Sequence, residues 1–148
     1  MVLAIDVSNT HTKIGVYDHD RLVRHWRLRT DPERTSDEYG AILLGLFGAA
    51  GLEPPEITGV ILSSVVPPIN QTMDELGRKF FGHAPVSVGP GVKTGMPILY
   101  DNPKEVGADR IVNAVAAYER TRGPSIVVEF ATATTFDYVT GPGGYLGG

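Results

Sequence analysis

The sequence has 148 residues, about the length of one domain, and 42% of them are hydrophobic while 20% are charged. Thirteen basic and seventeen acidic side chains give a formal net charge of −4, which is not typical of a nucleic-acid-binding surface. No apolar run is long enough to span a membrane, and no cysteine is available for a disulfide or a thiolate metal site. We therefore expect a cytoplasmic globular protein without a nucleic-acid or membrane partner.

Three strands are predicted at the start of the chain, at residues 2–7, 13–17 and 22–29. The first is apolar up to Asp6, which is typical of a central strand covered on both faces. In the third, Leu22, Trp26 and Leu28 recur at period two, so we expect them to share one face of the sheet. Trp26 is interpreted as a core residue at a contact between sheet and helix.

Two helices and two further strands follow. Thr35-Ser-Asp-Glu38 has the form of a capping box, and a helical stripe of apolar residues runs from it towards a stop at Gly51. Residues 59–64 read as a buried strand, Pro67 begins a second helix that ends at Gly82, and residues 85–88 form a short strand. This order predicts an α/β fold with a mixed sheet crossed by helices.

Residues 89–106 have no usable periodicity but contain an apolar centre, so we interpret them as an ordered binding loop. A helix is predicted over residues 111–122. At its start, Asp109 is either a catalyst or simply the N-cap. Arg110 pairs either with a substrate carboxylate or, for structural reasons, with a nearby acid. The sequence alone favours the structural alternative for both residues.

Two hairpins, 3–17 and 126–140, have the same design. Each has an apolar strand that ends in a carboxylate (Asp6 or Glu129), a turn of small and hydroxyl residues, and a return strand. Backbone N–H groups in such a turn can bind an anion, and the carboxylate can hold a cation that neutralises phosphate oxygens. The two turns either grip one polyphosphate from opposite sides or belong to ordinary hairpins with Thr-rich strands.

Six segments in this order resemble the N-terminal part of a type III pantothenate kinase: Asp6–Thr12, Ser63–Pro68, Gly89–Gly95, Tyr100–Pro103, Gly107–Arg110 and Thr132–Thr135. The resemblance implies a fold of the acetate and sugar kinase, Hsp70 and actin superfamily, with ATP between two ribonuclease-H-like halves. Residues 1–123 would then form the first ribonuclease-H-like domain with a substrate loop and a linking helix. Residues 124–148 would be the start of a truncated second domain.

The same resemblance implies ATP-dependent phosphorylation of pantothenate, the first step of coenzyme A biosynthesis, by a homodimer that needs Mg²⁺ and a monovalent cation (K⁺ or NH₄⁺). It assigns phosphate contacts to Asp6, Val7, Ser8, Asn9, Thr10, His11, Thr12 and Lys13, and a further ATP contact to Thr132. It assigns Mg²⁺ to Asp6 and the monovalent cation to position 129, here Glu129. It assigns pantothenate contacts to Tyr100, Gly107, Ala108, Asp109 and Arg110, with Asp109 as the proton acceptor.

Four positions depart from the family pattern: Ser8 and Ala131 replace glycines, His11 replaces Asn and Glu129 replaces Asp. A Cβ in a left-handed turn would cost about 1–2 kcal/mol. The longer Glu129 would misplace a cation ligand, and His11 is either a phosphate contact or an exposed turn residue. We therefore expect these 148 residues alone, as a fragment or a degenerate copy, to be a poor kinase or none. The alternative is a non-catalytic nucleotide-binding or regulatory relative.

Overall fold

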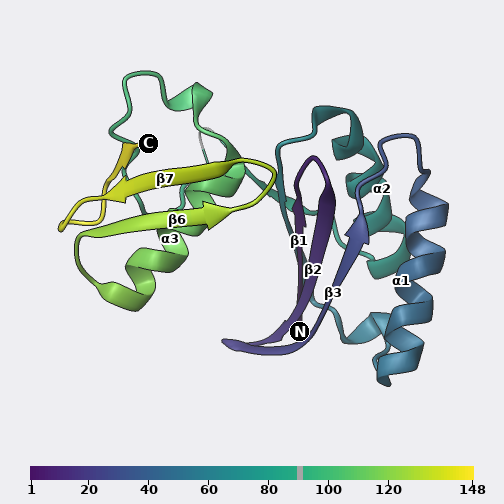
Figure 1. Ribbon diagram of the computed structural model, residues 1–148. Helices are drawn as coiled ribbons and strands as arrows, with labels where there is room; N and C mark the ends of the chain where they lie inside the picture. The colour runs from purple at the N-terminus through teal and green to yellow at the C-terminus, as the bar shows by residue number, and fades with distance from the viewer. Residues whose placement is uncertain (90–91) are drawn as a thin grey trace. The chain divides into compact units, whose positions relative to one another are not determined.

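The computed structural model describes residues 1–89 and 92–148, which divide into two compact units, Met1–Ser87 and Val88–Gly148 (Figure 1). Pro90 and Gly91, which belong to the Gly89–Gly95 segment and to the predicted binding loop, lie outside the described residues. The division precedes the third helix, whereas the sequence placed a boundary between residues 123 and 124. That residues 124–148 begin a truncated second domain stays a prediction.

The first unit is built on a mixed sheet with the strand order β3-β2-β1-β4-β5. Its strands are β1 (Val2–Val7), β2 (His11–Asp18), β3 (Arg21–Arg29), β4 (Gly59–Ser64) and β5 (Val86–Val88). β1 runs antiparallel to β2 and parallel to β4. The mixed α/β sheet is thus confirmed. It places the end of β1 between the start of β2 and the end of β4.

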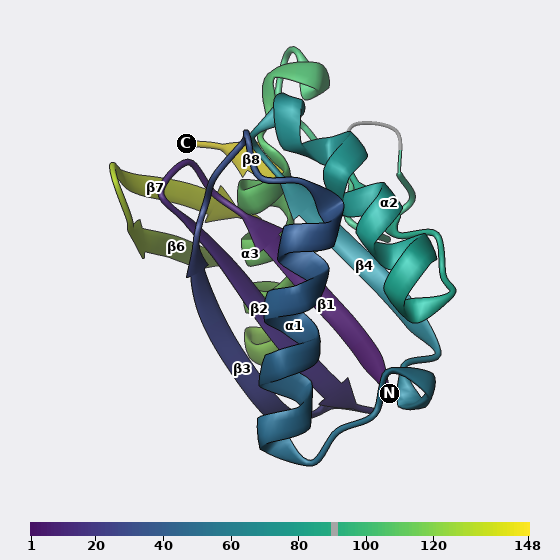
Figure 2. The same ribbon diagram turned by 90° about the vertical axis from the view of Figure 1, so that its right-hand side faces the viewer.

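Helices α1 (Ser36–Ala50) and α2 (Asn70–Phe81) lie on one face of this sheet (Figure 2). Their apolar stripes and the sheet share one core, whose largest members include Leu3, Tyr39, Leu43, Phe47, Ile69, Met73 and Leu76. In β1 the odd-numbered residues are buried, while Val2 is 42% exposed and Asp6 is half-buried. The prediction that β1 is covered on both faces was therefore wrong, because its side chains alternate between core and surface.

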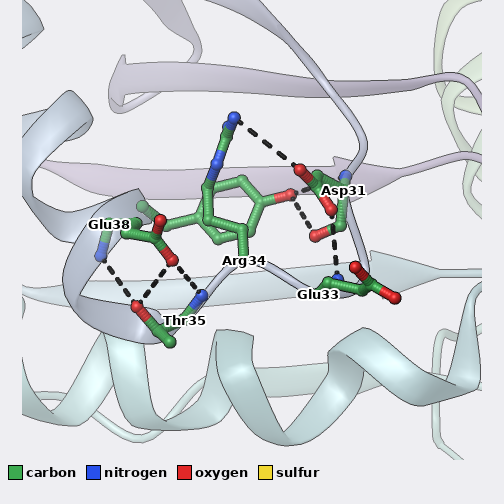
Figure 3. A network of polar contacts seen from close by, with 6 residues as sticks. Asp31, Glu33, Arg34, Thr35 and Glu38 are labelled. Carbon is green, nitrogen blue, oxygen red and sulfur yellow. Dashed lines mark hydrogen bonds and ion pairs between the residues drawn. The ribbon is translucent and has the colours of Figure 1, made fainter.

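Helix α1 begins and ends at the predicted residues. Thr35 is the N-cap: its Oγ1 accepts a hydrogen bond from the Glu38 backbone N–H (3.3 Å), and the Glu38 carboxylate accepts one from the Thr35 N–H (2.8 Å; Figure 3). The Thr35 hydroxyl also donates to the Glu38 carboxylate (2.9 Å), and the bonds to this carboxylate from the Thr35 backbone and then from its side chain lower the pKa of Glu38. At the other end, Gly51 takes a left-handed conformation with φ of 69°.

Strand β3 confirms one packing prediction and corrects another. The Trp26 ring lies 5.6 Å from the Phe47 ring of α1, centroid to centroid, as expected for a sheet–helix contact. The β2–β3 register shifts between Val16 and Tyr17, and an extra residue in one strand reverses the alternation of its side chains. Leu22 is 44% exposed, so its predicted place on the face of Trp26 was wrong.

Helix α2 also starts differently from the prediction. Pro67–Ile69 forms a 3₁₀ turn, and the α-helix proper runs from Asn70 to Phe81 with Gly82 as its left-handed C-cap. Ile69 is fully buried, so the 3₁₀ turn already contributes a side chain to the core.

The second unit combines helix α3 (Ala108–Thr121) with an antiparallel sheet in the order β6-β7-β8 (Figure 1). Its strands are β6 (Ser125–Phe130), β7 (Thr134–Val139) and β8 (Tyr145–Gly147). The short β8 was not predicted. It anchors the long loop, because Tyr145 accepts a hydrogen bond from the Leu99 N–H (2.7 Å) and donates its own N–H to Pro97 O (2.9 Å).

A small core joins the loop, the helix and the sheet of this unit: Met96, Val106, Ile111, Ala114, Val139 and Tyr145. α3 contacts both β6 and β7, so a helix covers one face of the second hairpin. The opposite face exposes apolar side chains, with Phe130 84%, Ile126 69% and Phe136 58% accessible. Among the described residues, no helix is both long and apolar enough to cross a membrane.

Candidate functional site

The first turn, between β1 and β2, is tight. The Ser8 N–H donates to His11 O over 3.0 Å, and Asn9 and Thr10 lie exposed at its tip. Within the described part of the chain, the non-glycine residues with positive φ are His19 and Arg122. Ser8 therefore does not adopt the left-handed conformation for which we expected a penalty, and that expectation was wrong.

A chain of hydroxyl groups supports this turn from the core side. Thr30 Oγ1 donates to Ser8 O (2.7 Å) and lies 2.9 Å from Thr12 Oγ1. Because a hydroxyl has one proton, Thr12 must be the donor in the second bond. Thr12 is fully buried, and Val7 is 1% exposed. The side chains of Val7 and Thr12, two residues of the predicted phosphate motif, therefore lie inside the fold and shape the turn rather than face a ligand. The sequence analysis did not predict the supporting role of Thr30.

Asp6 lies at the end of β1 on the sheet face opposite the helices. Its Oδ2 is 3.5 Å from the Lys13 Nζ, and its Oδ1 is buried without a hydrogen-bond partner among the described residues. In the parallel register Asp6 lies beside Ser63, whose buried Oγ is also unsatisfied. Two orphaned oxygens on one face fit a hard cation, which takes oxygen ligands. The described residues contain no group of three acidic, His or Cys side chains arranged for a metal.

The second turn joins β6 to β7, and the Ala131 N–H donates to Ala133 O across it (3.1 Å). Thr132 is exposed at this turn. Ala131 also lacks a positive φ, so the predicted left-handed strain is absent there as well. The Glu129 Oε2 accepts a hydrogen bond from Asn113 Nδ2 of α3 (2.9 Å), which ties the carboxylate to the helix.

Helix α3 places Asp109 and Arg110 in its first turn. The N-cap is Gly107, so the N-cap role considered for Asp109 was wrong; Asp109 is the second helical residue and is half-buried. Its Oδ1 accepts a hydrogen bond from the Arg110 N–H (2.8 Å). Ala108, 6% exposed, belongs to the core, so only its backbone can face a ligand.

The side chain of Arg110 pairs with a nearby acid, as the structural alternative expects, and it stays 27% exposed. Its Nε lies 3.4 Å from Oδ1 of Asp137, a β7 residue that is 2% exposed. Tyr145 donates its hydroxyl proton to the same oxygen over 2.6 Å. The sequence did not single out Asp137 or Tyr145, because the pairing depends on β8 folding back on β7.

Tyr100 lies at the edge of this group and is 37% exposed. A Cβ added to Gly147 would come within 2.8 Å of the Tyr100 ring, so the ring packs on the backbone of β8. The second unit therefore gathers Tyr100, Gly107, Asp109 and Arg110 on α3, its preceding loop and β8. The first turn belongs to the other unit, and the joint grip of both turns on one polyphosphate stays a prediction.

Residues 2–148 match the family model described as type III pantothenate kinase. The chain belongs to this family. It is 58% identical to the type III pantothenate kinases of Anaeromyxobacter sp. (strain K) and Geobacter sulfurreducens, and 56% identical to that of Myxococcus xanthus. Each match covers 100% of this chain and 58% of the relative. The chain thus spans little more than half the length of these pantothenate kinases.

A solved structure also resembles the chain. A candidate 2-dehydro-3-deoxygalactonokinase from Sinorhizobium meliloti matches with a TM-score of 0.53 over 95% of this chain and 50% of that one. The sequence identity is 13%, so the likeness concerns the fold alone. It agrees with the mixed α/β sheet predicted for a pantothenate kinase of this family.

Proposed function

We propose that this chain carries the pantothenate contacts, the proton acceptor and one phosphate turn of an ATP-dependent pantothenate kinase. The observation that carries the proposal is the placement of Asp109 and Arg110 side by side in the first turn of α3, in a chain that matches the family over residues 2–148. A carboxylate and a guanidinium at one helix start can serve a substrate that has both a hydroxyl and a carboxylate.

In the proposed reaction, Asp109 accepts the proton of the pantothenate hydroxyl as that oxygen attacks the γ-phosphorus of ATP. The new O–P bond forms while the bond from the γ-phosphorus to the bridging oxygen breaks, and ADP leaves with that bond's electron pair. The hydrogen bond from the Arg110 N–H holds Oδ1, which fixes the orientation of the carboxylate. Arg110 and Tyr100 would hold the rest of pantothenate, next to the Gly107 backbone.

The first turn would hold the ATP phosphates. Its exposed tip at Asn9 and Thr10 presents backbone and side-chain donors, and His11 and Lys13 add polar groups beside it. Asp6 would hold Mg²⁺ through its orphaned Oδ1, since Mg²⁺ in kinases commonly takes one or two carboxylates together with phosphate oxygens. When bound, Mg²⁺ neutralises charge on the transferred phosphoryl group.

The second turn would contribute Thr132 to ATP binding. We also assign the monovalent cation to Glu129, with its carboxylate oriented by Asn113. This monovalent cation would be K⁺ or NH₄⁺. We further propose that the kinase is a cytoplasmic homodimer and that each subunit has the two ribonuclease-H-like halves expected of the superfamily.

A second candidate is a non-catalytic relative that binds nucleotide without turnover. The replacement of Asp by Glu129 at the proposed cation site favours it, since this change touches the chemistry directly. The two candidates are separated by a single-turnover assay with the protein in excess over radiolabelled ATP, with and without pantothenate. We expect pantothenate-dependent transfer of label, more slowly than the about 1–100 s⁻¹ common for kinases. Nucleotide binding without any transfer would favour the non-catalytic candidate.

A further inference from the structure

Two side chains outside the predicted site meet Arg110 within the second unit. Asp137 projects from β7 into the core side of the sheet, and Tyr145, fully buried, projects from β8. One oxygen of Asp137, Oδ1, contacts both the Tyr145 hydroxyl (2.6 Å) and the Arg110 Nε (3.4 Å). Arg110 also donates from Nη1 to the backbone oxygen of Gly148 (3.3 Å).

The Asp137–Tyr145 pair is a rigid anchor. A buried carboxylate is costly unless it is paired and hydrogen-bonded, and Asp137 has both a cation and a hydroxyl donor. Burial first, and then the hydrogen bond and negative charge of Asp137, raise the pKa of Tyr145 to about 12. The phenol therefore stays protonated at neutral pH and keeps donating to Asp137.

Arg110 is held at Nε by the Asp137 carboxylate and at Nη1 by the Gly148 backbone oxygen, but it is not fully buried. Its side chain keeps 27% of its accessible surface, while the Nε side faces the buried carboxylate. A free arginine side chain loses rotamer entropy when it binds a ligand, and an anchored one has lost most of it beforehand. Separately, the backbone N–H of the same residue donates to the Asp109 carboxylate and orients it.

We propose that Asp137 and Tyr145 are positioning residues, which hold the Arg110 guanidinium in one orientation so that it binds the carboxylate of the substrate. This inference rests on the proposed function, because it assigns to Arg110 the carboxylate of pantothenate. Neither residue touches the reacting atoms. The contribution of both is to the affinity for a carboxylate-bearing ligand.

The test uses the full 148-residue chain and the variants Asp137→Asn and Tyr145→Phe. Tyr138→Phe is the matched control, since it removes the same hydroxyl from a neighbouring residue on the opposite, exposed face of β7. Calorimetry measures binding of pantothenate and of pantothenol, its uncharged alcohol analogue. Nitrogen-15 spectra record the arginine Nε–H signals, with that of Arg110 assigned by its loss in Arg110→Lys.

We expect Asp137→Asn to weaken pantothenate binding about tenfold and to leave pantothenol binding unchanged, because only the former ligand has a carboxylate. Tyr145→Phe should have a smaller effect in the same direction, and Tyr138→Phe none. The Arg110 Nε–H signal should exchange with water faster in both test variants.

Equal weakening of both ligands, or an unchanged Arg110 signal in folded Asp137→Asn, would overturn the positioning role and leave a merely structural one. If the unaltered chain binds neither ligand, the proposed substrate assignment fails. In that case the spectra alone decide whether Asp137 positions Arg110, so the two failures are distinguishable.

Discussion

The hydroxyl chain beneath the first turn makes an asymmetric prediction about stability. In Thr30→Val, which preserves shape, the buried Thr12 hydroxyl loses its acceptor and Ser8 O loses its donor. In Thr12→Val, Thr30 keeps its proton on Ser8 O and only one bond is lost. Because each hydroxyl has a single proton, the direction of both bonds is fixed. Thr30→Val should therefore lose more stability than Thr12→Val.

The magnitudes follow from burial. Thr12 is 0% exposed and Thr30 is 7% exposed, so water cannot replace the lost partners without opening the turn. An orphaned buried polar group costs about 1–3 kcal/mol, and a net hydrogen bond contributes about 1 kcal/mol. We expect Thr12→Val to lower the free energy of unfolding by about 1 kcal/mol and Thr30→Val by about 2–3 kcal/mol.

The assay is urea unfolding monitored by tryptophan fluorescence. Trp26 is the single tryptophan of the sequence and packs on Phe47, so its emission reports the first unit. With a slope of about 1 kcal/mol per molar urea, the two variants should differ in midpoint by about 1–2 M. Thr30→Ser, which keeps the hydroxyl, is the control and should lie close to the unaltered protein. Equal midpoints for the two valine variants would refute the assigned bond direction.

Two further predictions concern one residue in each unit and a matched control. Gly40→Ala should destabilise the first unit by about 1–3 kcal/mol, because the new Cβ would lie 2.3 Å from the Phe80 ring. The control Gly45→Ala, in the same helix, meets nothing within 4 Å and should stabilise the unit by about 0.5–1 kcal/mol. Thermal unfolding followed by fluorescence checks this; equal signs would contradict it. For Tyr145 the folded pKa of about 12 lies above the ordinary value of 10.0, so its contribution to stability is complete below pH 10 and is lost between pH 10 and 12. Unfolding measured across that range should be less pH-dependent in Tyr145→Phe, and identical profiles would count against the buried bond.

Local signals in the sequence were sufficient for much of the fold. The capping box of Thr35 and Glu38 and the left-handed stops at Gly51 and Gly82 depend on residues close together in the chain, so α1 and the end of α2 were predictable. The family motifs likewise located Asp109 and Arg110 at the start of α3.

The remaining features depend on contacts between distant residues. The burial of Thr12 follows from Thr30, eighteen positions away, and no local pattern marks that pair. A bulge displaced Leu22 from its expected face. The partner of Arg110 became visible only when β8 placed Tyr145 against Asp137, because a three-residue strand has too little periodicity to be recognised.

The proton-acceptor role of Asp109 is tested most directly by Asp109→Asn in the single-turnover assay with ATP and pantothenate. Asp74→Asn is the control, since it changes an exposed helical carboxylate that pairs with Arg78 in the other unit. We predict that Asp109→Asn lowers the rate of pantothenate phosphorylation by about 10²–10⁴-fold while pantothenate still binds, and that Asp74→Asn keeps the unaltered rate. Phosphorylation by Asp109→Asn at the rate of the unaltered chain would contradict the account.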